Sequence, residues 1–240
     1  MAFPETHRSA VLAIRSADPE ERSRALDAVV RAYWRPVYGH LRRKWRADET
    51  RAEDLAQGFF ALALEKEWLG RFDPAKGRFR TFLLSCLDAY AANDRRAARR
   101  HKRGGDAALL PLESEGEDGD MQEIPVADSR DLEADFHREW TRSLFGLAVD
   151  ALRSRCRETG KEEAFALFER YDMEGPDDPD RPTYARLAAE TGLPVTQVTN
   201  HLHWARREFR ATVLRTLREI TASEAEFRAE ARALLGGDPP

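Results

Sequence analysis

The sequence contains few cysteines and no long apolar run. The two cysteines among its 240 residues, Cys86 and Cys156, are too few for a disulfide framework, and Cys86 lies in an apolar stripe typical of a buried, reduced thiol. No stretch approaches the run of about 18 apolar residues that a membrane-spanning helix needs. The first residues show neither the basic segment nor the apolar core of a secretory signal. We therefore expect a cytoplasmic protein with no membrane partner.

Recognisable catalytic and metal-binding patterns are also missing. The sequence has no glycine-rich phosphate loop and no nucleophile elbow. His201 and His203 stand two apart on an expected helix, so they point to different faces and chelate one ion poorly. The acidic pairs Glu117-Asp118 and Glu162-Glu163 fall in exposed or flexible stretches without pocket partners. We predict no enzyme activity, no metal site and no cofactor.

The net charge of −4 excludes a protein that is basic throughout, but the charge is unevenly distributed. Residues 71–103 hold ten basic and three acidic residues, a net charge of +7. Residues 104–139 hold two basic and twelve acidic residues, a net charge of −10. Such asymmetry indicates a polyanion as partner of the basic block, with a merely solvated helix face as the alternative.

The acidic stretch reads as a flexible linker. Residues 104–135 contain repeated glycines and prolines, and their apolar residues follow no sustained period. Two roles for the acidic charge stay open: it keeps the chain soluble, or it covers a basic DNA-binding surface until a partner displaces it. In either case the segment divides the chain into two parts.

Outside this stretch the hydrophobic pattern predicts helices throughout. Asp18 followed by Pro19 marks a helix start, and the helix would extend to about Arg46 with a kink or break at Pro36. Residues 70–77 read as a loop. The next helix carries apolar residues at positions i, i+3, i+4, i+7, i+8 and i+11, and then becomes basic. The apolar residues are Phe79, Phe82, Leu83, Cys86, Leu87 and Tyr90.

Residues 183–209 have the spacing of a helix-turn-helix. Ala188 is small enough for two helices to approach, and Gly192 stands four residues later, where the turn favours a positive φ. Val198 follows ten residues after Ala188 and would pack the second helix against the first. The outward positions of this helix carry side chains that read base edges or hold phosphates, with an ordinary helical hairpin as the alternative. These residues are Thr196, Gln197, Thr199, Asn200, His203, Arg206 and Arg207.

Three segments together resemble bacterial RNA polymerase sigma factors of the extracytoplasmic-function (ECF) type. Residues 52–60 (AEDLAQGFF) and 71–83 (RFDPAKGRFRTFL) resemble sigma region 2, and residues 184–207 resemble region 4. The resemblance implies an all-α fold with two small helical domains, a region 2 bundle and a region 4 helix-turn-helix, joined by the acidic linker. We expect the region 2 domain at 1–103, the linker at 104–135, the region 4 domain at 136–221 and a C-terminal extension at 222–240.

The resemblance also implies roles for individual residues. Region 2 would bind the polymerase core through Glu53, Asp54, Leu55, Gln57 and Phe60. It would bind the minus-ten promoter element through Arg71, Asp73, Lys76, Arg78, Arg80, Asn93, Arg95, Arg96, Arg99 and Arg100. The helix-turn-helix residues given above would bind the minus-thirty-five element.

The expected partners are the RNA polymerase core, through its β′ clamp and β flap, and promoter DNA; an anti-sigma factor is left open. Two other functions are weighed: a stand-alone helix-turn-helix regulator, and an interaction protein that sequesters a sigma regulator. The linker is long for the ECF group, and residues 174–182 form an insertion-like turn. We hypothesise that the extension after Ile220 regulates activity.

Overall fold

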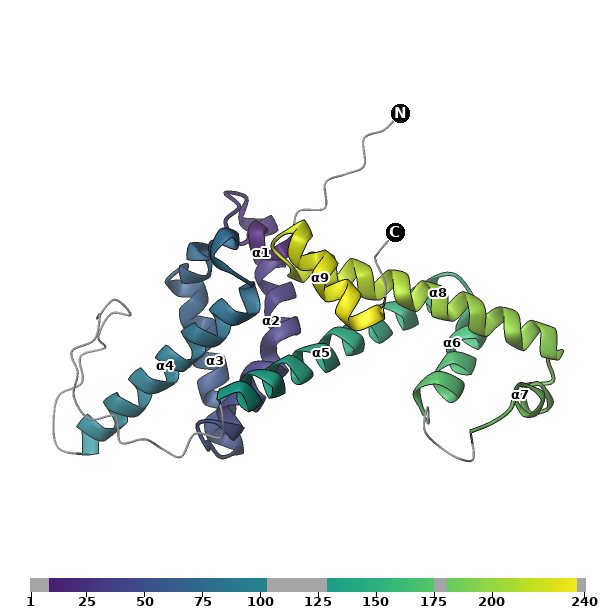
Figure 1. Ribbon diagram of the computed structural model, residues 1–240, viewed down its shortest axis with the longest axis horizontal. Coiled ribbons are helices and arrows are strands. Elements are labelled where there is room, and N and C mark those ends of the chain that lie inside the picture. The colour runs from purple at the N-terminus through teal and green to yellow at the C-terminus, as the bar shows by residue number, and fades with distance from the viewer. Residues whose placement is uncertain (1–8, 103–128, 175–180, 237–240) are drawn as a thin grey trace. The chain divides into compact units, whose positions relative to one another are not determined.

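The computed structural model describes residues 9–102, 129–174 and 181–236, and all regular elements in these ranges are helical, as predicted (Figure 1). None of the described helices is long and apolar enough to cross a membrane. The elements are α1 (Ala10–Ala13), α2 (Pro19–Arg43), α3 (Glu49–Glu65), η1 (Trp68–Arg71), η2 (Pro74–Lys76), α4 (Phe79–Lys102), α5 (Ser129–Glu158), α6 (Glu162–Phe168), η3 (Glu169–Met173), α7 (Tyr184–Thr191), α8 (Val195–Ile220) and α9 (Glu224–Leu235).

The chain forms two units whose bounds differ from the expected domain boundaries. Unit 1 contains the described residues up to Ser143 together with Glu219–Phe227, and unit 2 contains Leu144–Arg218 and the described residues from Arg228. Residues 129–135, expected in the linker, are helical, because α5 already begins at Ser129. The rest of the expected linker, residues 104–128, lies outside the described residues.

Helix α2 begins as the sequence indicates but does not break at its internal proline. Asp18 accepts a hydrogen bond from the Glu20 amide at 3.0 Å and caps the helix. The helix then continues through Pro36 to Arg43, so the expected break is absent. Pro36 is buried between the fully buried Tyr33 and Val37, and this packing offsets the backbone hydrogen bond that proline removes.

Buried aromatic rings join the helices of unit 1 to the loop before α4. Tyr33 of α2 meets Phe79 at the start of α4, with ring centroids 5.6 Å apart. Phe79 in turn meets Phe72 of the loop at 5.2 Å. Phe59 of α3 lies 5.3 Å from Trp68 of η1. The loop is therefore anchored in the hydrophobic core on both sides.

The first half of α5 completes unit 1. Leu132, Phe136 and Trp140 recur every four residues and are all buried, which places them on one face of the helix. Arg43 of α2 pairs with Glu139 at 2.8 Å, and this hydrogen bond lowers the pKa of the Glu139 carboxyl. Apolar burial and an ion pair thus attach the first half of α5 to unit 1, although the sequence analysis expected part of this segment in the linker.

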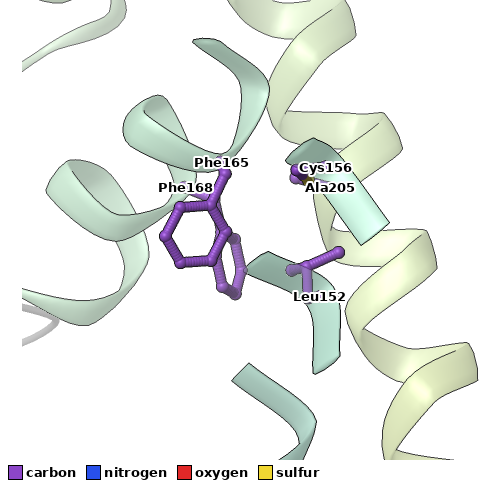
Figure 2. Packing of buried hydrophobic residues seen from close by; sticks show 5 residues of the cluster. All are labelled: Leu152, Cys156, Phe165, Phe168 and Ala205. Atoms are coloured by element: carbon purple, nitrogen blue, oxygen red, sulfur yellow. The ribbon is translucent and has the colours of Figure 1, made fainter. Parts of the chain in front are cut away.

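Unit 2 has two adjoining clusters of buried side chains. One joins α5, α6 and α8 through Leu152, Cys156, Phe165, Phe168 and Ala205 (Figure 2). The second joins α6, α7 and α8 through Leu167, Leu187, Ala188, Val198 and Leu202. Helix α9 contributes through its C-terminus, where the Leu235 carbonyl accepts a hydrogen bond from Arg210 at 3.3 Å. A regulatory role for this C-terminal segment stays a prediction.

Candidate functional site

The polymerase-binding residues expected on α3 divide between its surface and the core. Glu53, Asp54 and Gln57 are exposed and lie on one side of the helix, since they are three and four residues apart. Leu55 and Phe60 are buried, 6% and 4% exposed. The Phe60 ring also stacks on Trp34 of α2, with centroids 6.0 Å apart. The surface of α3 around residues 53–57 is therefore acidic and polar.

The loop before α4 is anchored at its ends and exposed in its middle. Arg15 donates hydrogen bonds to the Gly70 and Phe72 carbonyls. Asp73 accepts from the Ala75 amide at 3.0 Å and caps η2, so this carboxylate is engaged in the turn. Gly77 has a φ of +148°, a conformation that other residues rarely adopt. Of the predicted DNA-binding residues here, Arg71, Lys76 and Arg78 are exposed.

Helix α4 displays a basic stripe at its C-terminal end. Four exposed arginines occur there at one side of the helix, and half-buried Asn93 accepts a hydrogen bond from one of them. This part of α4 therefore suits a nucleic-acid backbone. The four arginines are Arg95, Arg96, Arg99 and Arg100.

Arg80, expected in the same DNA-binding set, is engaged inside unit 1. Its guanidinium lies over the Trp140 ring, 4.8 Å from the centroid. This cation–π contact leaves the side chain half-buried. Sequence spacing alone does not distinguish it from the exposed arginines, because Trp140 is 60 residues away along the chain.

A partly buried polar network, which the sequence analysis missed, fixes α4 against α2. The Asp88 carboxylate accepts hydrogen bonds from His40 Nε2 at 2.8 Å, Lys44 Nζ at 2.8 Å and Trp45 Nε1 at 3.1 Å. Burial by itself would raise the pKa of Asp88, but these hydrogen bonds and the charge of His40 outweigh it and lower the pKa. The network holds α4 on α2 and so helps to set the position of the basic end of α4.

Helices α7 and α8 form the expected helix-turn-helix layout. Thr183 caps α7 by accepting from the Arg186 amide at 3.2 Å. Gly192 ends α7 with φ +72° and ψ 11°, the left-handed conformation predicted for this turn. Ala188 and Val198 lie in one buried cluster, as their ten-residue spacing indicated. Pattern and structure agree closely here because each contact is local.

Replacing Gly192 by alanine should destabilise this turn. An alanine in the left-handed conformation costs about 1 kcal/mol, because its Cβ approaches the backbone. We expect the free energy of unfolding of the full chain to fall by about that amount in urea titrations. Gly146→Ala, in the middle of α5, is the control: a Cβ there meets nothing within 4 Å, so helix propensity should leave stability equal or higher. An unchanged stability for Gly192→Ala would contradict the assigned turn.

Most of the residues predicted to read DNA on α8 are exposed. Thr196, Gln197, Asn200 and His203 present polar side chains along its first turns. Thr199 is also exposed, but its hydroxyl already donates to the Val195 carbonyl at 2.9 Å and keeps only acceptor capacity. The face is polar and accessible over about two helical turns.

The two arginines that follow on α8 have different surroundings. Arg207 is 66% exposed in its side chain and makes a 3.9 Å contact with Glu208. Arg206 instead donates two hydrogen bonds to Asp172 of η3, at 2.8 and 2.9 Å. These bonds raise the pKa of the Arg206 guanidinium. The predicted phosphate contact of Arg206 thus competes with an internal ion pair that the sequence did not reveal.

Neither histidine nor cysteine chemistry suggests a further site. Within residues 9–102, 129–174 and 181–236, no group of three or more histidine, cysteine and acidic residues is placed to hold a metal ion. Cys86 is half-buried rather than fully buried, and Cys156 is the buried thiol. Burial raises the pKa of Cys86 to about 11.

Comparison with known proteins bears on unit 1. No curated protein and no solved structure matches the chain. Residues 29–101, which run from within α2 to the basic end of α4, match the family model of Sigma-70 region 2. The matched segment contains the exposed acidic face of α3, the anchored loop and the arginine stripe. The chain therefore carries a sigma-70 region 2 domain, which supports a transcription initiation factor of the sigma-70 family.

Proposed function

We propose that this protein is an ECF-type sigma factor, which binds the RNA polymerase core and directs it to promoters. The observation that carries the proposal is the region 2 match, together with the exposure of Glu53, Asp54 and Gln57 on α3 inside it. An exposed acidic and amide face on a rigid helix suits docking onto a helical partner such as the coiled coil of the β′ clamp. The protein would act without catalysis of its own, in the bacterial cytoplasm.

In this proposal the two units divide the promoter between them. The anchored loop before α4 would receive bases of the melted minus-ten element, and the arginine stripe of α4 would follow the phosphates. Helix α8 would enter the major groove of the minus-thirty-five element. Polymerase contacts through the β′ clamp and the β flap would tether both units and raise their effective concentration at the promoter.

Reconstitution with bacterial core polymerase and a promoter library tests the proposal. The wild-type chain should yield specific transcripts, and Asp54→Ala combined with Gln57→Ala should weaken core binding about tenfold, because it removes two contacts of an exposed face. Core affinity is measured by competition, and transcripts are counted at limiting protein concentration.

A matched double variant separates a local effect from a general loss of charge. Asp150→Ala with Ser154→Ala removes an acid and a small polar group from an exposed part of α5 in unit 2, and it should leave core binding unchanged. Equal core affinity for both double variants would contradict the α3 docking face. A wild-type chain that selects DNA but does not bind the core would instead establish the stand-alone regulator.

A further inference from the structure

Five side chains form an interlocked group on the flank of α8, and we refer to them as the Asp172 cluster. The Asp172 carboxylate accepts from Arg206 Nε at 2.8 Å and from Arg206 Nη2 at 2.9 Å. It also accepts from Arg181 Nη2 at 3.2 Å. One carboxylate, 19% exposed, therefore holds two guanidinium groups. The members are Tyr171, Asp172, Arg181, Tyr184 and Arg206.

Two tyrosine rings complete the cluster. Both guanidinium groups contact the Tyr171 ring: that of Arg181 lies 3.8 Å and that of Arg206 5.4 Å from the ring centroid. The Tyr184 ring lies 4.9 Å from Tyr171, and its hydroxyl accepts from Arg206 Nη1 at 3.3 Å. Arg181 Nε also donates to the Tyr171 carbonyl at 3.0 Å. Residues of η3, α7 and α8 thus meet Arg181, which precedes α7 by three residues, at one point.

This arrangement constrains rotation of α8 about its own axis. The two hydrogen bonds from Arg206 form a bidentate pair, which sets orientation as well as distance. Arg206 lies three residues beyond His203, the last of the predicted base-reading residues. In a helix that turns about 100° per residue, a small rotation redirects every side chain along the exposed face. The hydrophobic contacts of Val198 and Leu202 hold α8 against α7 but are less directional.

We propose that the Asp172 cluster positions α8 for sequence-specific DNA recognition and, at the same time, withholds Arg181 and Arg206 from DNA phosphates. The inference rests on the proposed function, because that function assigns DNA to α8. Asp172 is a positioning residue in this account, since it touches Arg206 and Arg181 and makes no contact with bases. Its charge offsets one of the two positive charges and its hydrogen bonds hold both guanidinium groups, so the exposed polar side chains of α8, and not the general attraction of arginine for phosphate, dominate the choice of site.

Removing the Asp172 charge should change specific and non-specific DNA binding in opposite directions. Asp172→Asn removes the charge that holds both arginines, while keeping a side chain of similar size. The released guanidinium groups gain phosphate contacts, and each contact makes the slope of log affinity against log salt steeper by about 0.9. Binding to unrelated DNA should strengthen, whereas the preference for the promoter should fall about tenfold, the value of one lost base contact. A substitution that merely unfolds unit 2 would weaken both.

The test uses the full chain, alone and as holoenzyme, with two duplexes of equal length. One carries a promoter selected from the library by the wild-type holoenzyme, and the other is scrambled. Glu174→Gln is the control. It removes the same charge at a position two residues after Asp172, where the carboxylate forms an exposed 3.0 Å pair with Arg170. Asp172→Glu keeps the carboxylate and should restore the wild-type salt slope. Amide hydrogen exchange across residues 169–173 and 184–206 should accelerate in Asp172→Asn and stay unchanged in Glu174→Gln.

Each outcome decides between the two proposals. A steeper salt slope, reduced promoter preference and faster exchange in Asp172→Asn alone support the positioning role. Unchanged preference and slope in Asp172→Asn, with a wild-type chain that prefers its promoter, overturn the positioning role and leave the proposed function intact. If the wild-type chain shows no promoter preference, either alone or as holoenzyme, the proposed function is overturned. The role of the cluster in specificity is then overturned as well.

Discussion

Trp140→Ala should be among the most destabilising single substitutions in unit 1, lowering the free energy of unfolding by about 3–5 kcal/mol. The Trp140 side chain is almost fully buried and lies under the Arg80 guanidinium. Truncation to alanine removes a large apolar group, leaves a cavity and ends the cation–π contact. Urea unfolding of the full chain, followed by far-ultraviolet circular dichroism, measures the loss.

Trp140→Phe provides the contrast. The Nε1 atom of Trp140 is buried and has no hydrogen-bond partner among the described residues. Replacement by phenylalanine therefore removes a donor that makes no hydrogen bond to this part of the chain. We expect this variant to lose about 1.5 kcal/mol or less, since it keeps most of the buried ring. If Trp140→Ala also loses less than about 1.5 kcal/mol, the first half of α5 is not part of the core of unit 1.

Asp88→Asn should be the second large effect, lowering the free energy of unfolding by about 3 kcal/mol near neutral pH. The carboxylate accepts three hydrogen bonds, including one from the buried His40, and an amide replaces only part of them. Asp150→Asn is the matched control. The Asp150 carboxylate is 71% exposed and pairs with Arg153 at 2.9 Å. Because the pair is exposed, its loss should lower the free energy of unfolding by well under about 1 kcal/mol.

The effect of Asp88 should depend on pH in a defined direction. Because the folded protein holds the pKa of this carboxyl below its ordinary value, the ionised form is the one that stabilises the fold. The stability difference between wild type and Asp88→Asn should be complete above the unfolded pKa of about 4. It should shrink as the pH falls through the lowered folded pKa. A difference that stays constant through this acid range would contradict the assigned network.

The agreement between sequence and structure is best where contacts are local. The apolar spacing from Phe79 to Tyr90 predicted α4, and Ala188, Gly192 and Val198 predicted the turn and packing of α7 and α8. A helix period and a left-handed turn residue act over a few positions, so a single sequence reports them. The region 2 segments identified by resemblance likewise fall within residues 29–101.

The sequence by itself thus determined the all-helical fold, the basic character of the end of α4 and the exposed polar face of α8. Only the tertiary structure decided the partners of individual charged side chains. Arg80 meets Trp140, and Arg206 meets Asp172, across 60 and 34 residues of chain. An arginine suits a phosphate, a carboxylate or an aromatic ring equally well. Which of these it contacts depends on the segments that folding brings beside it, and periodicity carries no information about them.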